Sequence, residues 1–155
     1  MDKNEIIVTS IENKKLLDIA RALPKYGRLK VHEKQLVYLD IDNRFINELC
    51  PLIEHEKVEK PDYFSMGIGA HISIIYPNET MKPIFESNQI IHFQIANLFK
   101  AETSQAIYYG LVMESPDLIK IRKANNLSEQ MNFNGYIIDI HATIGKIKKR
   151  QNAAS

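Results

Sequence analysis

The chain is poor in several residue types and patterns that often reveal a function. It contains one cysteine, Cys50, among 155 residues. A single cysteine excludes an internal disulfide framework and leaves no thiolate cluster for zinc, so we expect a reducing, cytoplasmic compartment. The formal net charge is only +1, which gives no global basic field of the kind that holds long nucleic acids. A nucleic-acid ligand is therefore expected to be short or held locally.

Long apolar runs are also missing. The first five residues are mostly polar or charged and are followed by only a brief apolar run, so neither a signal peptide nor a membrane span is expected. The content of 45% hydrophobic and 25% charged residues is ordinary for a globular protein. We expect residues 1–155 to form a single domain that acts as a monomer.

The apolar pattern predicts both helices and strands. Thr9 and Glu12 have the spacing of a capping box, and apolar residues then recur at helical spacing as far as Pro24. The segment 36–41 alternates like a strand and leads into a short helical pattern. The first half of the chain is therefore expected to begin with a helix and continue through a strand and a second helix.

The second half has similar signals. Segments 91–99 and 107–113 alternate like paired strands, which predicts a hairpin. Ser115 is followed by proline, as at the start of a helix, and an Asn-Gly pair at 134–135 predicts a turn into the last strand.

A repeat relates the two halves. The intervals 36–71 and 106–141 are each 35 residues long, and both are predicted to contain strand, helix and strand. This repeat suggests two similar lobes that face each other.

Two short segments carry the chemistry. Residues 71–74 read His-Ile-Ser-Ile and residues 141–144 read His-Ala-Thr-Ile. Side chains two apart in a strand share a face, so each segment directs an imidazole and a hydroxyl to the same side. Histidine moves protons near neutral pH, and a hydroxyl can hydrogen-bond a phosphate oxygen without titrating. Two such strands side by side would form a paired acid/base site.

These segments, with the Gly-Lys that follows the second, resemble the paired His-x-Thr/Ser-apolar signatures of the 2H phosphoesterase superfamily. This superfamily includes bacterial 2'-5' RNA ligase-like proteins, cyclic phosphodiesterases and phage enzymes that cut cyclic-oligonucleotide signals. The resemblance extends from about Leu36 to Ile147. It implies an α+β fold with two pseudo-symmetric lobes of antiparallel sheet and outer helices around a central cleft. The second lobe would span roughly residues 90–147.

The resemblance also implies roles for the motif residues. His71 and His141 would be the general base and general acid, and Ser73 and Thr143 would bind phosphate oxygens. Ser73 replaces the threonine that is commoner in the family. It lacks the methyl group that stiffens threonine, so its phosphate contact is expected to be looser.

Two further residues are implied to bind substrate. Lys146 stands where the family often has a phosphate-binding basic residue, and Tyr76 stands where an aromatic often flanks the base or sugar. Strict alternation would turn both side chains away from the histidines, so they reach the cleft only if the strands bend or bulge. Tyr108 and Tyr109 are adjacent and are expected to point to opposite faces.

The implied activity is that of a phosphodiesterase that needs no metal or other cofactor. Its expected partners are a 2',3'-cyclic phosphate, a 2'-5' linked oligonucleotide, or a cyclic nucleotide or oligonucleotide. One neutral imidazole would take a proton, and the other, protonated, would give one to the departing oxygen.

Three alternatives remain open at this stage. The same cleft could bind a nucleotide or RNA without turnover. His71, His141 and Asp139 could form a metal site, although Asp139 is only two residues before His141 and no tight ligand cluster is visible. The chain could also be a scaffold, which would leave the matched motifs unexplained. The remaining histidines are expected to be exposed: His32, His55 and His92.

Overall fold

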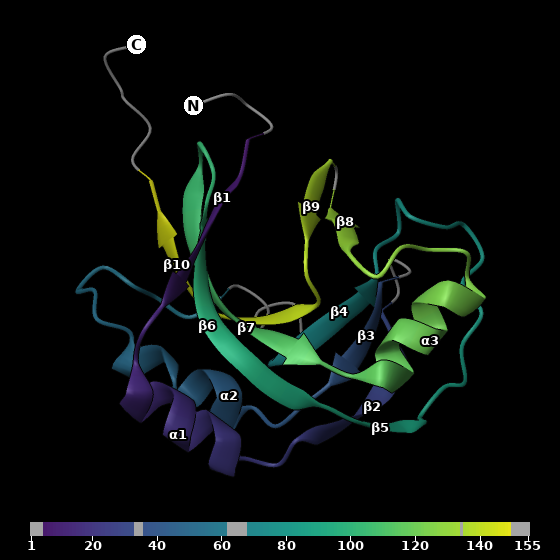
Figure 1. Cartoon of the computed structure of the whole chain (residues 1–155), viewed down its shortest axis with the longest axis horizontal. Helices are drawn as coiled ribbons and strands as arrows, with labels where there is room; N and C mark the ends of the chain where they lie inside the picture. Colours follow the sequence, from purple (N-terminus) through teal and green to yellow (C-terminus); the bar gives the residue numbers. More distant parts are fainter. Residues whose placement is uncertain (1–4, 33–35, 62–67, 134, 150–155) are drawn as a thin grey trace.

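The computed structural model describes residues 5–32, 36–61, 68–133 and 135–149 (Figure 1). These residues form an α+β fold with two four-stranded antiparallel sheets and a two-stranded hairpin. The expected fold class is confirmed, because the arrangement is consistent with the two-lobed fold of the 2H phosphoesterases. In the described ranges, no helix is long and apolar enough to cross a membrane.

Sheet A belongs mainly to the second half of the chain. Its strands lie in the order β1 (Ile7–Ile11), β6 (Gln94–Glu102), β7 (Ala106–Glu114) and β10 (His141–Lys148). Sheet B belongs mainly to the first half and has the order β4 (His71–Ile75), β3 (Val37–Asp40), β2 (Tyr26–Val31) and β5 (Ile90–His92), the last of which comes from the second half. Each motif therefore lies on an edge strand, and these two edge strands, β4 and β10, contact each other.

The helices connect the two halves. The helical segments are α1 (Lys14–Ala22), α2 (Arg44–Asn47), the 3-10 turn η1 (Cys50–Leu52) and α3 (Pro116–Ala124). Helix α2, from the first half, packs on β10 of sheet A, whereas α3, from the second half, packs on β4 and β5 of sheet B. Figure 1 shows α1 and α2 together at one side of the molecule and α3 at the other. This exchange of helices gives the two sheets one shared apolar core.

The predicted repeat is present in the structure. The first interval contains β3, α2 and β4, and the second contains β7, α3 and β10. The second interval also contains a hairpin of β8 (Met131–Phe133) and β9 (Tyr136–Ile138), which the sequence pattern does not predict. Gly135 in its turn has a φ of 100°, a conformation that favours glycine. The hairpin rises above the junction of the sheets in Figure 1.

Two local predictions were wrong. The predicted capping residue Thr9 lies in β1 and pairs with Lys100, and the N-cap of α1 is Asn13, whose side chain accepts a hydrogen bond from the amide of Leu16. An Asn side chain satisfies the exposed amides as well as Thr does, so the pattern fitted both positions. The predicted strand 91–99 is two strands, β5 and β6, which belong to different sheets. By contrast, Ser115 caps α3 as predicted.

Candidate functional site

The first motif directs His71 and Ser73 to one face of sheet B. In the ladder with β3, His71 lies opposite Asp40 and Ser73 lies opposite Tyr38. The intervening Ile72 is completely buried in the core, as expected from alternation along a strand. His71 itself is only 5% exposed, and Ser73 is partly buried.

The second motif repeats this arrangement in sheet A. His141 lies opposite Val112 and Thr143 lies opposite Gly110 of β7, whereas Ala142 points into the core. His141 and Thr143 are both partly buried. The structure therefore places an imidazole and a hydroxyl on one face of each edge strand, as the sequence predicted.

The two imidazoles are oriented by the same type of hydrogen bond. His71 Nδ1 lies 2.9 Å from the carbonyl oxygen of Gly69, and His141 Nδ1 lies 2.7 Å from that of Asp139. Each carbonyl belongs to the residue two positions earlier in the chain. A carbonyl oxygen only accepts, so Nδ1 must donate in both rings. In the neutral form of each ring the lone pair is then on Nε2, which is the nitrogen suited to proton transfer.

An aromatic ring contacts each histidine edge to face. The ring centroids of Tyr38 and His71 are 5.6 Å apart at an interplanar angle of 77°, and those of Phe99 and His141 are 5.5 Å apart at 86°. Phe99 reaches His141 over Gly110, where a Cβ atom would lie 2.8 Å from the Phe99 ring. Neither Tyr38 nor Phe99 has a motif spacing from which a contact across strands could be predicted.

A turn before β4 positions the carbonyl that holds His71. Gly69 has a φ of 73°, and a Cβ atom there would lie 2.5 Å from Oδ1 of Asn43. The same Oδ1 accepts a hydrogen bond of 3.0 Å from the amide of Ala70. Asn43 is the N-cap residue of α2, but its side chain makes no cap bond there and instead supports this turn.

The electrostatics couple the two histidines. Burial lowers the pKa of His71, and the nearby charge of His141 lowers it further, although the bond to Gly69 and the charge of Asp40 oppose these effects. Burial also lowers the pKa of His141, against the bond to the Asp139 carbonyl and the charge of the Asp139 carboxylate. The charge of His141 therefore acts on His71, as the contact between β4 and β10 allows.

A β-bulge brings Lys146 to the motif face. The β7–β10 register shifts between Thr143 and Gly145, and Lys146 then lies opposite Tyr108. Tyr108 and Val112 point to the same side of β7, since they are four residues apart in a regular strand. Lys146 consequently shares a face with His141, which meets the condition that the sequence analysis set for it. Its Nζ lies 5.6 Å from the centre of the Tyr108 ring.

Tyr76 is placed differently. It follows the last residue of β4, is partly buried and packs against the apolar core. Its amide donates a hydrogen bond of 3.0 Å to the Glu79 carboxylate. The contacts of Tyr76 thus place it with the core, unlike those of Lys146. Tyr108 and Tyr109 do point to opposite faces, and Tyr109 is buried in the core.

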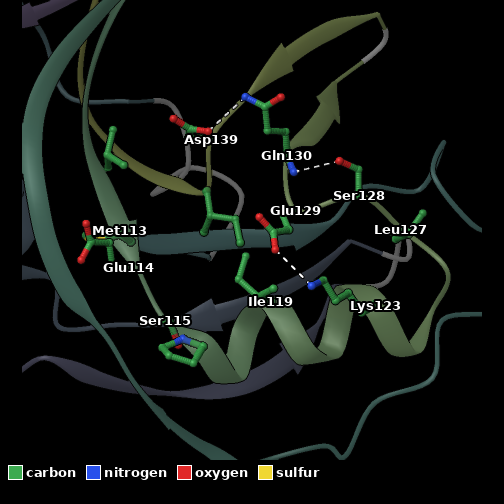
Figure 2. Close-up of a pocket in the computed structure, with 13 residues that line it drawn as sticks. Met113, Glu114, Ser115, Ile119, Lys123, Leu127, Ser128, Glu129, Gln130 and Asp139 are labelled. Carbon is green, nitrogen blue, oxygen red and sulfur yellow. Dashed lines mark hydrogen bonds and ion pairs between the residues drawn. The ribbon is translucent and has the colours of Figure 1, made fainter.

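A groove borders the second motif. Its volume is about 940 Å³, and it is lined by Val112 and Glu114 of β7, by one side of α3 and by residues 127–130 and 139–140. Figure 2 shows the bond of 3.1 Å from Gln130 to Asp139 across one end of it and the ion pair of Lys123 with Glu129 beside α3. Val112 is the direct neighbour of His141 across the ladder, so the groove adjoins the motif.

The other predicted alternatives can be compared with the structure. In the part of the chain that the structure describes, no group of three or more His, Cys, Asp or Glu residues is arranged to hold a metal ion. His92 is exposed beside Tyr26, with ring centroids 5.8 Å apart, and His55 is exposed as well. His32 is partly buried rather than exposed.

Comparison with known proteins identifies the family. No curated protein and no solved structure gives a significant match to the chain. The family described as "Swiss Army Knife, 2H phosphoesterase domain" matches residues 37–152, which is most of the chain and includes both motifs. The chain therefore belongs to the 2H phosphoesterase family.

Proposed function

We propose that this protein is a metal-independent phosphodiesterase that acts on 2',3'-cyclic phosphate, 2'-5' linked or cyclic oligonucleotide substrates. Membership of the 2H family supports a phosphoesterase activity in general. The observation that carries the finer proposal is the matched setting of His71 and His141. Each donates through Nδ1 to a carbonyl two residues earlier, and each has a hydroxyl two residues later on the same face.

The reaction divides two proton transfers between the two rings. A neutral imidazole accepts a proton through Nε2 from the attacking water or ribose hydroxyl, and a protonated imidazole gives one to the departing oxygen. Ser73 and Thr143 donate hydrogen bonds to the phosphate oxygens, and Lys146 adds a positive charge on the same face as Thr143. No step of this mechanism uses a metal ion or another cofactor.

We assign His71 as the base and His141 as the acid. Positive charge on His141 disfavours protonation of His71, so the pair favours one proton over two. A carboxylate favours the charged form of each ring, Asp139 that of His141 and Asp40 that of His71. The rings differ in access to solvent, since His71 is only 5% exposed and His141 is partly buried. A single shared proton would therefore reside mainly on His141.

The test is a panel of phosphodiesters incubated with the protein in the presence of a chelator, with products identified by mass. We expect hydrolysis of at least one class, and a loss in kcat of roughly a hundred- to ten-thousandfold in His71→Ala and in His141→Ala. His55→Ala is the matched control, because this exposed histidine lies outside both motif strands. Folding of each variant is checked by its thermal transition.

A non-catalytic module that binds nucleotides is the second candidate, since the same hydroxyls and Lys146 would bind a phosphate without turnover. Binding of the panel with no product, unchanged in His71→Ala and His141→Ala, would select this candidate over the phosphodiesterase.

A further inference from the structure

The face of sheet B that carries His71 continues across the sheet to its opposite edge. In the ladders, His71 lies opposite Asp40, Asp40 opposite Arg28, and Arg28 opposite Ile90. Residues directly opposite each other in antiparallel strands point to the same side. The side chains of all four strands in this row therefore share one face.

A second and a third row complete this face. Ser73, Tyr38 and Lys30 lie in line on β4, β3 and β2, and Tyr26 lies opposite His92 on the outer two strands. The opposite face of the same strands is the buried core, with Leu29, Leu39 and Ile91 at most 1% exposed. One face of sheet B thus packs in the core, whereas the other face carries the first motif and extends from β4 to β5.

The outer part of this face is exposed and rich in rings. Tyr26 is 50% exposed and Ile90 is 48% exposed, although both are large. His92 is exposed as well, and its ring lies 5.8 Å from that of Tyr26 at an angle of 45°. Arg28, which lies between Ile90 and Asp40 in its row, is exposed. We call these four residues the outer strip: Tyr26, Arg28, Ile90 and His92.

The charge on this face favours an anion. Lys30 and Asp40 form an ion pair of 2.6 Å and largely neutralise each other. Arg28 remains as the excess positive charge, and its hydrogen bond among the described residues is a long one, 3.5 Å to the carbonyl oxygen of Asn88. The groove beside the second motif has the opposite character, because its lysine, Lys123, pairs with Glu129 and leaves the carboxylates of Glu114 and Asp139 in excess. A chain of phosphates that leaves the site is therefore favoured along sheet B.

We propose that the outer strip binds the single-stranded oligonucleotide chain attached to the phosphodiester at His71 and His141. This inference rests on the proposed function and restricts its substrate to oligonucleotides. Aromatic side chains stack on bases of any sequence, and an arginine contacts the backbone. Three strand spacings separate β4 from β5, which is about 14 Å. A ligand must extend well beyond one nucleotide to occupy both the site and the strip.

The first test measures binding directly. Fluorescence anisotropy with a labelled single-stranded RNA of about eight nucleotides compares the unaltered protein with Tyr26→Ala, Tyr26→Phe and Arg28→Ala. We expect Tyr26→Ala to weaken binding about fivefold or more, and Tyr26→Phe to retain most of the affinity because it keeps the ring. Arg28→Ala should lower the slope of log affinity against log salt by about 0.7, the value for one phosphate contact on a single strand. Lys15→Ala, an exposed lysine on α1, should change neither quantity.

The second test uses turnover. The ratio of kcat/KM for the oligonucleotide to kcat/KM for a mononucleotide with the same phosphodiester should be well above one, and should fall toward one in Tyr26→Ala and Arg28→Ala. If hydrolysis occurs but neither the ratio nor the RNA affinity depends on these residues, the outer strip is not an oligonucleotide site. If no phosphodiester is hydrolysed while Tyr26→Ala still weakens RNA binding, the outer strip is an oligonucleotide site but the proposed enzymatic function is wrong. Absence of RNA binding to the unaltered protein would overturn the strip and favour another kind of partner.

Discussion

Lys146 lies directly across the β7–β10 ladder from Tyr108, with its Nζ 5.6 Å from the centre of the tyrosine ring. The bulge after Thr143 creates this position, since it returns the side chain at 146 to the face of the second motif. The cation–π contact holds the ammonium group at that face. The positive charge therefore lies on the face that carries His141 and Thr143.

Removal of this charge should reduce the stabilisation of the transition state. We expect Lys146→Ala to lower kcat/KM roughly ten- to a hundredfold, because a hydrogen bond to a charged group contributes about 1.5 to 3 kcal/mol. Lys148→Ala is the control, since Lys148 is the next lysine on the same face. Its side chain is exposed, and its Nζ lies 3.9 Å from a carboxylate oxygen of Glu59. Equal losses in the two variants would mean that Lys146 acts only through the general charge of β10.

The pH dependence of kcat/KM should be a bell displaced toward acid. The acid limb reports deprotonation of His71 and the alkaline limb reports loss of the proton from His141. Both pKa values are lowered, chiefly by burial, so both limbs move below the ordinary histidine value of 6.5. The optimum is expected on the acid side of that value. A profile measured from acidic to basic pH that is flat, or centred well above neutrality, would contradict the two-histidine mechanism.

The motif faces could be predicted from the sequence because they depend only on alternation. His71 with Ser73, and His141 with Thr143, follow from the geometry of any strand. The repeat likewise indicated two lobes. The family resemblance then supplied a reason to bring the two strands together, which no local pattern contains.

Other parts of the site depend on contacts between distant residues. The bulge that turns Lys146 inward accompanies Gly145, where a Cβ atom would lie 2.6 Å from Ile53 Cδ1. The sequence does not show that Ile53 packs there. The separation of 91–99 into β5 and β6 is also a tertiary effect, since one alternating pattern satisfies two different sheets. The short helical pattern after segment 36–41 forms α2 and then η1, and Pro51 fits at the start of η1 because that position needs no amide.

The motif hydroxyls should contribute through hydrogen bonding. We expect Thr143→Ala to lower kcat/KM roughly ten- to a hundredfold, since a hydrogen bond to a charged phosphate oxygen is lost. Thr143→Ser keeps the hydroxyl and should retain most of the activity, and Ser73→Ala should resemble Thr143→Ala. Kinetics of the folded variants measure both effects. An inactive Thr143→Ser would show that the methyl group, and not the hydroxyl, is what the site requires.

Gly69 should be more sensitive to substitution than another glycine with a positive φ. In Gly69→Ala, the new Cβ would strain the backbone by about 1 to 2 kcal/mol and would also press on Asn43, displacing the carbonyl that holds His71. Gly135 has a φ of 100°, and beyond its chain neighbours no atom of the described residues lies within 4 Å of the place a Cβ would take. We therefore expect both variants to lose some stability, but only Gly69→Ala to lose kcat in addition. Urea denaturation measures the loss of stability and kinetics measure kcat. Equal kcat values in the two variants would show that the turn at Gly69 does not position His71 for catalysis.

The guanidinium of Arg122 links α3, β4 and the segment before β8. Its side chain is 1% exposed and forms an ion pair of 2.7 Å with Glu79, whose side chain is 3% exposed. It also donates to the carbonyl oxygens of Ile74, Ser128 and Gln130 at 2.6 to 2.8 Å. Burial alone would raise the pKa of Glu79, but the hydrogen bonds and charge of Arg122, with two backbone amides, hold it below its ordinary value. The Glu79 carboxylate is therefore charged at neutral pH.

Loss of one partner should leave the other charged and buried. We expect Arg122→Met to lower the free energy of unfolding by about 3 to 5 kcal/mol. The double variant Arg122→Met/Glu79→Leu should regain part of this loss, because it removes the unpaired carboxylate. Lys123→Met, which breaks the exposed pair with Glu129, should cost about 1 kcal/mol or less. Urea denaturation measures all three. A cost for Arg122→Met no greater than that for Lys123→Met would show that the three carbonyls and Glu79 do not depend on the guanidinium, and that β4 is held in place by apolar packing alone.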